Sequence, residues 1–310
     1  MLKAYIAELL ELAQNDDRII HLLADSGEGY DTLFKHSYPD RMFNFGIAEQ
    51  NMLGAAAGLA LSGKIPFVFA QGAFLCYRAM EFMRNDICLQ NANVKIVGSG
   101  SGLALSSLGP SHHTTEDISI LRALPNLEIL SPASPSQVKQ CMLKAYENIG
   151  PSYIRLGMSE TDDILGSDHQ ITDDGFDIFN EEQKRSEIMI LSTGPILRNA
   201  AKAKSILESR GISVKLVNVW RLKPFNEELF LSLIDSCRIC ITVEEHNIHG
   251  GLGSIVAEII AKNGCGKKLI TLGLNDRFAV GYGTYDEVRQ QNGLSAEQIA
   301  EKAEEANNNE

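Results

Sequence analysis

The most informative stretch of the chain reads Arg41-Met42-Phe43-Asn44-Phe45-Gly46-Ile47-Ala48-Glu49-Gln50-Asn51-Met52. A run of small residues over 54–60 follows it, which is typical of a closely packed helix headed by Glu49. We expect the short apolar segment just before this helix to be buried. A buried carboxylate is costly to ionise unless it has a partner, so the stretch suggests a chemical role. The alternative is an ordinary acidic residue at a helix N-terminus, which the helix dipole favours.

Apolar runs alternate with helical patterns in both halves of the chain, and this predicts an α/β protein with two parallel-sheet domains. The expected strands are 19–25, 66–71, 94–100, 127–131, 153–156, 188–192, 214–219, 239–244 and 268–273. The expected helices are 49–61, 77–88, 116–123, 135–148, 199–210, 226–234 and 253–262. We expect one domain over 1–160, a linker over 161–185 with at most a short hairpin, and a second domain over 186–310 that ends in a frayed polar tail, 301–310.

Composition narrows the class of protein. The 310 residues are 44% hydrophobic and 22% charged, as in ordinary globular proteins, and the net charge of −12 disfavours nucleic acid or an anionic membrane as a partner. We find no apolar run of about 20 residues and no pattern of a signal peptide. Six cysteines are scattered through apolar segments, and only Cys237 and Cys240 have a C-x-x-C spacing, of which Cys240 lies inside an expected strand. We therefore expect buried thiols in a cytoplasmic protein rather than a redox or zinc site.

Aromatic side chains follow the expected strand 66–71, at the sheet edge where open α/β sheets bind ligands. Phe74 and Tyr77 are three residues apart and would share a face of a helix, although such pairs more often belong to a core. Further along, the glycines of 98–102 lack the dinucleotide-binding spacing. His112 and His113 are adjacent, so we expect one to face a cleft and the other to pack, with no shared metal.

A second polar run, 244–253, contains two glutamates, two histidines and three glycines. Its side chains alternate along the end of a strand, which disfavours a metal site, and its glycine turn into a helix could hold an anion. The preferred interpretation is a tight strand-to-helix turn at a domain or subunit contact. We assign no metal ligand within this chain.

Together these segments resemble the C-terminal half of the transketolase family, thiamine diphosphate enzymes that transfer a two-carbon ketol unit. The resemblance implies a pyrimidine-binding domain followed by the family's C-terminal domain. It also implies that Glu49 hydrogen-bonds N1′ of the aminopyrimidine and, in an apolar setting, promotes its imino tautomer. Phe74 would stack on the pyrimidine, Tyr77 would form another wall of the pocket, and Asp25 would lie near the thiazolium ring. His112 would contact hydroxyl and carbonyl oxygens of the ketose donor.

The family's Gly-Asp-Gly…Asn pattern, which holds Mg²⁺ and the diphosphate, does not occur in this sequence. The resemblance therefore implies a split enzyme whose N-terminal subunit carries the diphosphate-binding domain. Thiamine diphosphate and Mg²⁺ would then be held across the interface, in an α₂β₂ heterotetramer acting on small sugar or aldehyde substrates.

Four positions depart from the family's usual pattern in an ungapped comparison. Leu108 replaces an aspartate, Gly100 and Met158 replace a histidine and an arginine that bind a sugar phosphate, and Gln71 replaces a pocket aromatic. Charge-assisted hydrogen bonds are strong, so losing two donors to a phosphate matters. The hypothesis is that the substrates are not the ordinary pentose phosphates, or that the partner holds the phosphate.

Two other functions stay open at this point. A related acyloin-forming enzyme, such as a 1-deoxyxylulose 5-phosphate synthase or the β subunit of a 2-oxoacid dehydrogenase, would share much of the pattern. The segment Gly109-Pro110-Ser111-His112-His113 fits transketolase better than the oxoacid dehydrogenases. A non-catalytic structural partner is the other alternative, and the presence of Glu49, Phe74, Tyr77 and His112 argues against it.

Overall fold

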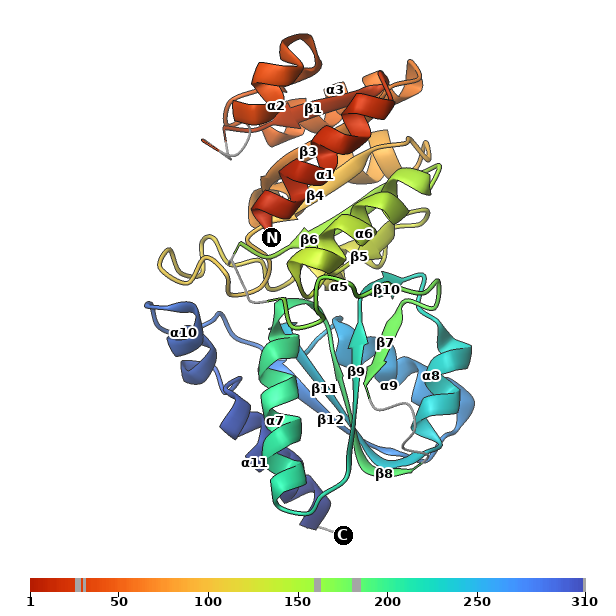
Figure 1. Cartoon of the computed structure of the whole chain (residues 1–310), viewed down its shortest axis with the longest axis vertical. Helices are drawn as coiled ribbons and strands as arrows, with labels where there is room; N and C mark the ends of the chain where they lie inside the picture. Colours follow the sequence, from red (N-terminus) through yellow and green to blue (C-terminus); the bar gives the residue numbers. More distant parts are fainter. Residues whose placement is uncertain (26–28, 30–31, 159–162, 180–184, 309–310) are drawn as a thin grey trace.

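Two separate β-sheets, one above the other along the long axis, organise the chain (Figure 1). The computed structural model describes residues 1–25, 29, 32–158, 163–179 and 185–308. The two α/β layers predicted from the sequence are confirmed, although each sheet also carries one antiparallel edge strand. No helix of the described ranges is long and apolar enough to cross a membrane.

The first sheet has seven strands in the order β10-β5-β6-β4-β3-β1-β2. Its strands are β1 (Ile19–Leu23), β2 (Met42–Asn44), β3 (Ile65–Gln71), β4 (Lys95–Ser99), β5 (Glu128–Leu130), β6 (Ser152–Leu156) and β10 (Arg221–Lys223). Apart from β10, all of them pair in parallel, so their carboxyl ends lie at one edge. That edge carries the start of the helix headed by Glu49.

The second sheet has five strands in the order β12-β11-β8-β9-β7. Its strands are β7 (Phe176–Phe179), β8 (Ser186–Ser192), β9 (Val214–Val219), β11 (Cys237–Asn247) and β12 (Lys268–Leu274). β7 lies in the segment expected to be a linker, where it pairs antiparallel with β9. Local periodicity did not indicate this strand because it is short and follows a polar, irregular run.

Helices cover both sheets (Figure 1). They are α1 (Leu2–Asn15), α2 (Thr32–Ser37), α3 (Glu49–Leu61), α4 (Met80–Phe82), α5 (Asp117–Leu121), α6 (Pro135–Glu147), α7 (Leu197–Ser209), α8 (Glu227–Ile234), α9 (Leu252–Asn263), α10 (Tyr285–Gln291) and α11 (Ala296–Asn308). The helix α1 was not predicted from the sequence. It buries an apolar stripe with helical spacing that includes Tyr5, Leu9 and Leu12.

The expectation of a frayed tail is wrong over the described residues. The helix α11 continues to Asn308 and packs against α7. Alanines at positions 296, 300, 303 and 306 recur at helical spacing and are buried. Because alanine has a small side chain, the two helices can approach closely. The prediction of a frayed tail relied on the overall polarity of the segment and did not take this alanine stripe into account.

The helix expected over 77–88 is interrupted. It consists of a π-helical segment at Phe74–Arg78, the short helix α4, and a second π-helical segment at Met83–Cys88. π-helical turns are rare and occur mostly at functional sites. The first of them follows the carboxyl end of β3 directly.

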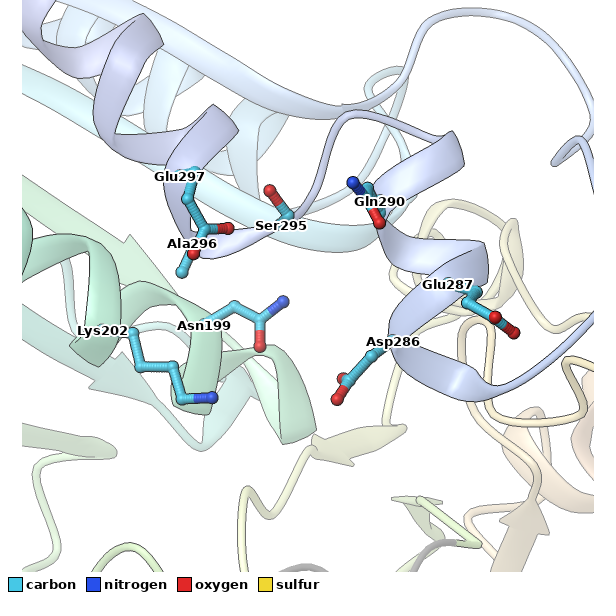
Figure 2. A pocket seen from close by; sticks show the side chains of 8 residues that line it. All are labelled: Asn199, Lys202, Asp286, Glu287, Gln290, Ser295, Ala296 and Glu297. Atoms are coloured by element: carbon cyan, nitrogen blue, oxygen red, sulfur yellow. The ribbon is translucent and has the colours of Figure 1, made fainter.

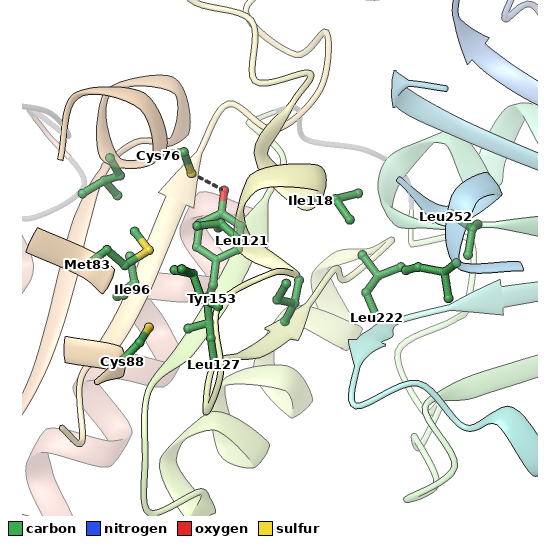
Figure 3. Packing of buried hydrophobic residues seen from close by; sticks show 14 of the residues in the cluster. Cys76, Met83, Cys88, Ile96, Ile118, Leu121, Leu127, Tyr153, Leu222 and Leu252 are labelled. Carbon is green, nitrogen blue, oxygen red and sulfur yellow. Dashed lines mark hydrogen bonds between the residues drawn. The ribbon is translucent and has the colours of Figure 1, made fainter. Parts of the chain in front are cut away.

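The apolar core is continuous between the two domains (Figure 3). Ile118 and Leu121 of α5 belong to the same buried cluster as Leu222 of β10 and Leu252 of α9. All four side chains are almost fully buried. The two domains are therefore held together by a shared apolar core, which fixes α5 of the first domain against α9 of the second.

A buried histidine in the first domain should make the free energy of unfolding depend on pH. His21 is fully buried, 3.3 Å from the carbonyl oxygen of Phe67, and burial lowers its pKa to about 4. The unfolded chain binds the proton near pH 6.5, so the stability contributed by neutral His21 is present above that pH. It is lost as the pH falls towards 4, by up to about 3 kcal/mol.

In urea titrations between pH 7 and pH 4, the wild-type chain should therefore lose more stability than His21→Phe. The phenylalanine ring fits the aromatic surroundings of Phe34 and Phe69 but cannot take up a proton. Parallel stability curves for the two proteins across that pH range would contradict this assignment.

Candidate active site

Glu49 lies at the start of α3, the helix that follows β2 and packs against β3 and β1. The structure confirms the predicted helix bounds, and only 1% of the Glu49 side chain is exposed. Its position in the first helical turn is favourable for a carboxylate. A nearly buried acid at the edge where α/β sheets bind ligands is the anchor of the site.

The surroundings of Glu49 differ from the apolar setting that we expected. The Nη1 atom of Arg78 lies 2.6 Å from Oε2 of Glu49 and forms a charge-assisted hydrogen bond. The segment before the helix is also not buried, since 47% of Phe43 and 73% of Ile47 are exposed. The reason is that β2 is the last strand of its sheet, so no further strand of this chain covers its outer edge.

Phe74, Arg78 and His112 form one contiguous group with Glu49. The Arg78 guanidinium lies over the Phe74 ring, with Cζ 4.7 Å from the ring centroid. The imidazole of His112 meets the same ring edge-on, with centroids 5.4 Å apart and planes at 68°. The Nδ1 atom of His112 is 2.9 Å from the Ser111 hydroxyl, which orients the imidazole. Three of the predicted site residues are thus brought together.

Tyr77 takes part in a neighbouring contact. Its hydroxyl donates to Oε2 of Glu116 at 2.6 Å and accepts the Glu116 backbone N–H at 3.1 Å. This pair ties the π-helical segment to the turn that enters α5. The ring remains 40% exposed. Tyr77 therefore keeps an exposed aromatic surface beside the group around Phe74.

Asp25 follows β1 and has a positive φ of 47°. Its backbone N–H donates to Oδ1 of Asn44 at 3.1 Å, and the same oxygen accepts the N–H of Gly46 at 2.9 Å. Asn44 thus fixes Asp25 against the turn that leads to Glu49. The sequence analysis did not predict a role for Asn44, because its side chain joins two segments that are nineteen positions apart.

The two adjacent histidines have different surroundings. His112 contacts Phe74, whereas His113 is only 2% exposed, and burial lowers its pKa. The carboxylate of Glu245 acts against this shift without cancelling it. His113 is therefore a buried imidazole that is neutral near pH 7. His112 is the imidazole that contacts Phe74.

Gly100 and Met158, two of the positions that depart from the family pattern, form an apolar wall together with Leu105. A side chain at Gly100 would place its Cβ 2.8 Å from Cδ1 of Leu105, and Met158 Sδ lies 3.6 Å away. Gly100 also has a φ of +75°, which disfavours any other residue. Leu108 is 46% exposed. The space that a larger residue at position 100 would need is filled by Leu105.

The turn after β11 connects the domains instead of forming a separate site. Glu244 accepts the backbone N–H groups of Leu252 and Gly253 at 2.7 and 2.8 Å. The Glu244 carboxylate thus accepts the N–H groups at the start of α9 that a bound anion would need. A Cβ at Gly251 would lie 2.0 Å from Oε2 of Glu244, which explains the glycine. His246 accepts the Ser119 N–H across the domain boundary, so the preferred interpretation is confirmed.

A surface cavity of about 250 Å³ lies elsewhere, among α7, α10 and α11 (Figure 2). Its walls include Asn199, Lys202, Asp286, Glu287 and Glu297. None of the predicted site residues lines this cavity, and its acids and single lysine form no arrangement typical of a catalytic site. The chemistry of the side chains around Glu49, rather than the size of a cavity, makes this group the candidate active site.

Comparison with known proteins places this geometry in a family. The family model "Transketolase, pyrimidine binding domain" matches residues 1–162, and "Transketolase, C-terminal domain" matches residues 179–299. The chain belongs to the transketolase family. Within it, this chain corresponds to the C-terminal subunit of a split transketolase, a transferase.

Similar proteins agree with this assignment. A subunit of an apulose-4-phosphate transketolase from Actinobacillus succinogenes is 34% identical over 96% of this chain and 95% of its own length. A 6-deoxy-6-sulfo-D-fructose transketolase subunit from a Clostridium species is 33% identical over 97% of this chain and 92% of its own. A solved structure described as a split gene transketolase, inactive beta4 tetramer, superimposes with a TM-score of 0.88 at 34% identity, covering 98% and 97% of the two chains.

The transketolase family implies dependence on thiamine diphosphate. The residues around Glu49 fit the aminopyrimidine end of that cofactor. Glu49 provides a buried carboxylate and Phe74 provides a ring face. At the end of β3, Oε1 of Gln71 is a buried acceptor that makes no hydrogen bond with the described residues. Over those same residues, no cluster of three His, Cys, Asp or Glu side chains could hold a metal ion.

Proposed function

We propose that this subunit forms the pyrimidine-binding half of a thiamine diphosphate site, completed by an N-terminal subunit that holds the diphosphate and Mg²⁺. The observation that carries the proposal is the grouping of buried Glu49 with Phe74 and His112 at one sheet edge. The reaction is the transfer of a two-carbon ketol unit from a ketose to an aldehyde.

When bound, the cofactor supplies the nucleophilic carbon needed to cleave the bond next to the ketose carbonyl. Glu49 would hold a proton at N1′ of the aminopyrimidine, as a general acid–base group. The Phe74 ring would fix the plane of the heterocycle, with Tyr77 as a second wall and Asp25 near the thiazolium end. His112, held by Ser111, would donate to oxygens of the donor and take up a proton from its hydroxyl.

Exposed apolar side chains next to Glu49 support the role of a partner. Phe43 and Ile47 are 47% and 73% exposed, and they lie on β2 and just before Glu49 in one short segment. Exposed apolar side chains that lie together are typical of protein interfaces. We place the N-terminal subunit over this surface, in an α₂β₂ assembly. Six free thiols suit a reducing compartment, so we place the assembly in the cytoplasm.

Calorimetry with thiamine diphosphate and Mg²⁺ tests the division of the site. The chain mixed with its N-terminal subunit should bind the cofactor and transfer ketol units, whereas the chain by itself should bind it at least about 100-fold more weakly, the loss expected when several charge-assisted bonds are removed. Equal affinity with and without the partner would contradict the proposal, as would a complex that binds no cofactor.

The apolar wall around Gly100 bears on the substrate. Leu105 and Met158 offer no donor to a phosphate, so we infer that the substrates differ from ordinary pentose phosphates, or that the partner holds the phosphate. The two named relatives act on apulose 4-phosphate and on 6-deoxy-6-sulfo-D-fructose, which shows how widely donors vary among similar subunits. We expect kcat/KM with xylulose 5-phosphate and ribose 5-phosphate to be at least about tenfold below that of a full-length transketolase, the scale of one lost charged contact. Equal values would refute the first alternative and would assign the phosphate to the partner.

A further inference from the structure

Arg78 occupies the place that the cofactor's ring would need. Its guanidinium is planar and cationic, it donates to Glu49 at 2.6 Å, and it lies over the Phe74 ring with Cζ 4.7 Å from the centroid. A hydrogen bond to the carboxylate and a stacking contact with the phenyl ring are the two contacts assigned above to the aminopyrimidine. Resting on the proposed function, we infer that Arg78 is a displaceable occupant of the pyrimidine site, and that cofactor binding exchanges one planar group for another.

The local backbone explains why this side chain reaches the site. Phe74 and Arg78 are the first and last residues of a π-helical segment, and they stand four positions apart. Residues four apart in a helical segment are neighbours on its surface, which sets the guanidinium against the ring. Ala79 then leaves the helical region, with φ −110° and ψ 20°. Arg78 thus starts from a short irregular turn and not from the middle of a regular helix.

The exposure of the two partners indicates which of them can move. Arg78 is 38% exposed, whereas Glu49 is 1% exposed and fixed at the start of α3. The arginine can swing towards water and regain its hydration there. The glutamate cannot, so it needs a donor at all times, because an unpaired buried carboxylate is costly. Arg78 supplies that donor while the site lacks the cofactor. With the cofactor bound, the proton shared between Glu49 and N1′ takes its place.

The exchange has a measurable consequence for affinity. Any cofactor that enters must break a charge-assisted hydrogen bond and a cation–π contact, and this lowers its apparent affinity. Removing the arginine removes that competition. The alternative role, in which Arg78 stays against Glu49 and helps to bind the cofactor, makes the opposite prediction. Affinity therefore distinguishes the two roles.

The test uses the complex of this chain with its N-terminal subunit and measures thiamine diphosphate binding, in the presence of Mg²⁺, by calorimetry. Arg78→Ala should bind the cofactor about tenfold more tightly than wild type, the scale of one lost competing contact of this kind. Arg84→Ala is the matched control, because Arg84 is exposed and its side chain donates to its neighbour Asn85. This control should bind like wild type.

Thermal unfolding gives a second readout that does not depend on activity. Without cofactor, Arg78→Ala should melt at a lower temperature than wild type because Glu49 loses its donor, and the cofactor should restore more of the melting temperature than it adds to wild type. Unchanged or weaker binding by Arg78→Ala would overturn the inference while leaving the proposed function intact. A wild-type complex that binds no thiamine diphosphate would overturn both.

Discussion

Replacing Glu49 with glutamine should lower ketol transfer by the complex about 100-fold or more, the scale of a lost general acid–base group. The amide has nearly the same shape and can still accept a hydrogen bond from Arg78, so the fold and the local geometry are little disturbed. It cannot, however, hold the acidic proton that N1′ requires. The measurement is kcat with saturating cofactor and substrate, which separates chemistry from binding.

The control for this variant is Glu81→Gln. Glu81 lies on α4, close in sequence to the π-helical segment, but it is exposed and accepts a hydrogen bond from Asn85. Its substitution should leave kcat within about twofold of wild type, as expected for exposed positions away from the reacting atoms. A Glu49→Gln enzyme with a wild-type kcat would remove this carboxylate from the reaction.

Replacing Arg155 with methionine should lower the free energy of unfolding by about 3–5 kcal/mol, the cost of leaving one member of a buried ion pair without its partner. Arg155 is 1% exposed and pairs with fully buried Asp117 at 2.8 Å. It also donates to the carbonyl oxygens of Thr114 and Glu245, the second of which belongs to the C-terminal domain. Urea unfolding measures the loss.

A second arginine at the same boundary provides the comparison. Arg122 also reaches across to the C-terminal domain, where it pairs with Glu258, but this glutamate is 64% exposed. Arg122→Met should therefore lower the free energy of unfolding by no more than about 1 kcal/mol, as for other exposed pairs. Equal losses for the two variants would show that burial does not set the strength of these contacts.

The sequence was sufficient to predict features that depend on local patterns. The helix over 49–61, the strand that ends at Gln71 and the position of Glu49 at a sheet edge follow from periodicity and residue type, and the structure contains them. Phe74 and His112 contact each other, as expected from the family resemblance, which assigned both residues to one site.

Features that depend on distant contacts were not predictable from local patterns. Arg78 and Glu49 are 29 positions apart, and their pairing needs the irregular π-helical turn, which has no sequence signature. The strand β10 follows β9 in the second half of the chain but pairs with β5 of the first domain. The buried alanines of α11 were hidden among charged residues.

The most direct test is an experimental structure of the chain bound to its N-terminal subunit with thiamine diphosphate and Mg²⁺. A carboxylate oxygen of Glu49 should lie within hydrogen-bonding distance of N1′, the pyrimidine should face Phe74, and the metal should be held by the partner. A cofactor bound away from Glu49, or a Glu49 carboxylate turned into bulk water in that complex, would contradict the proposed role of this subunit.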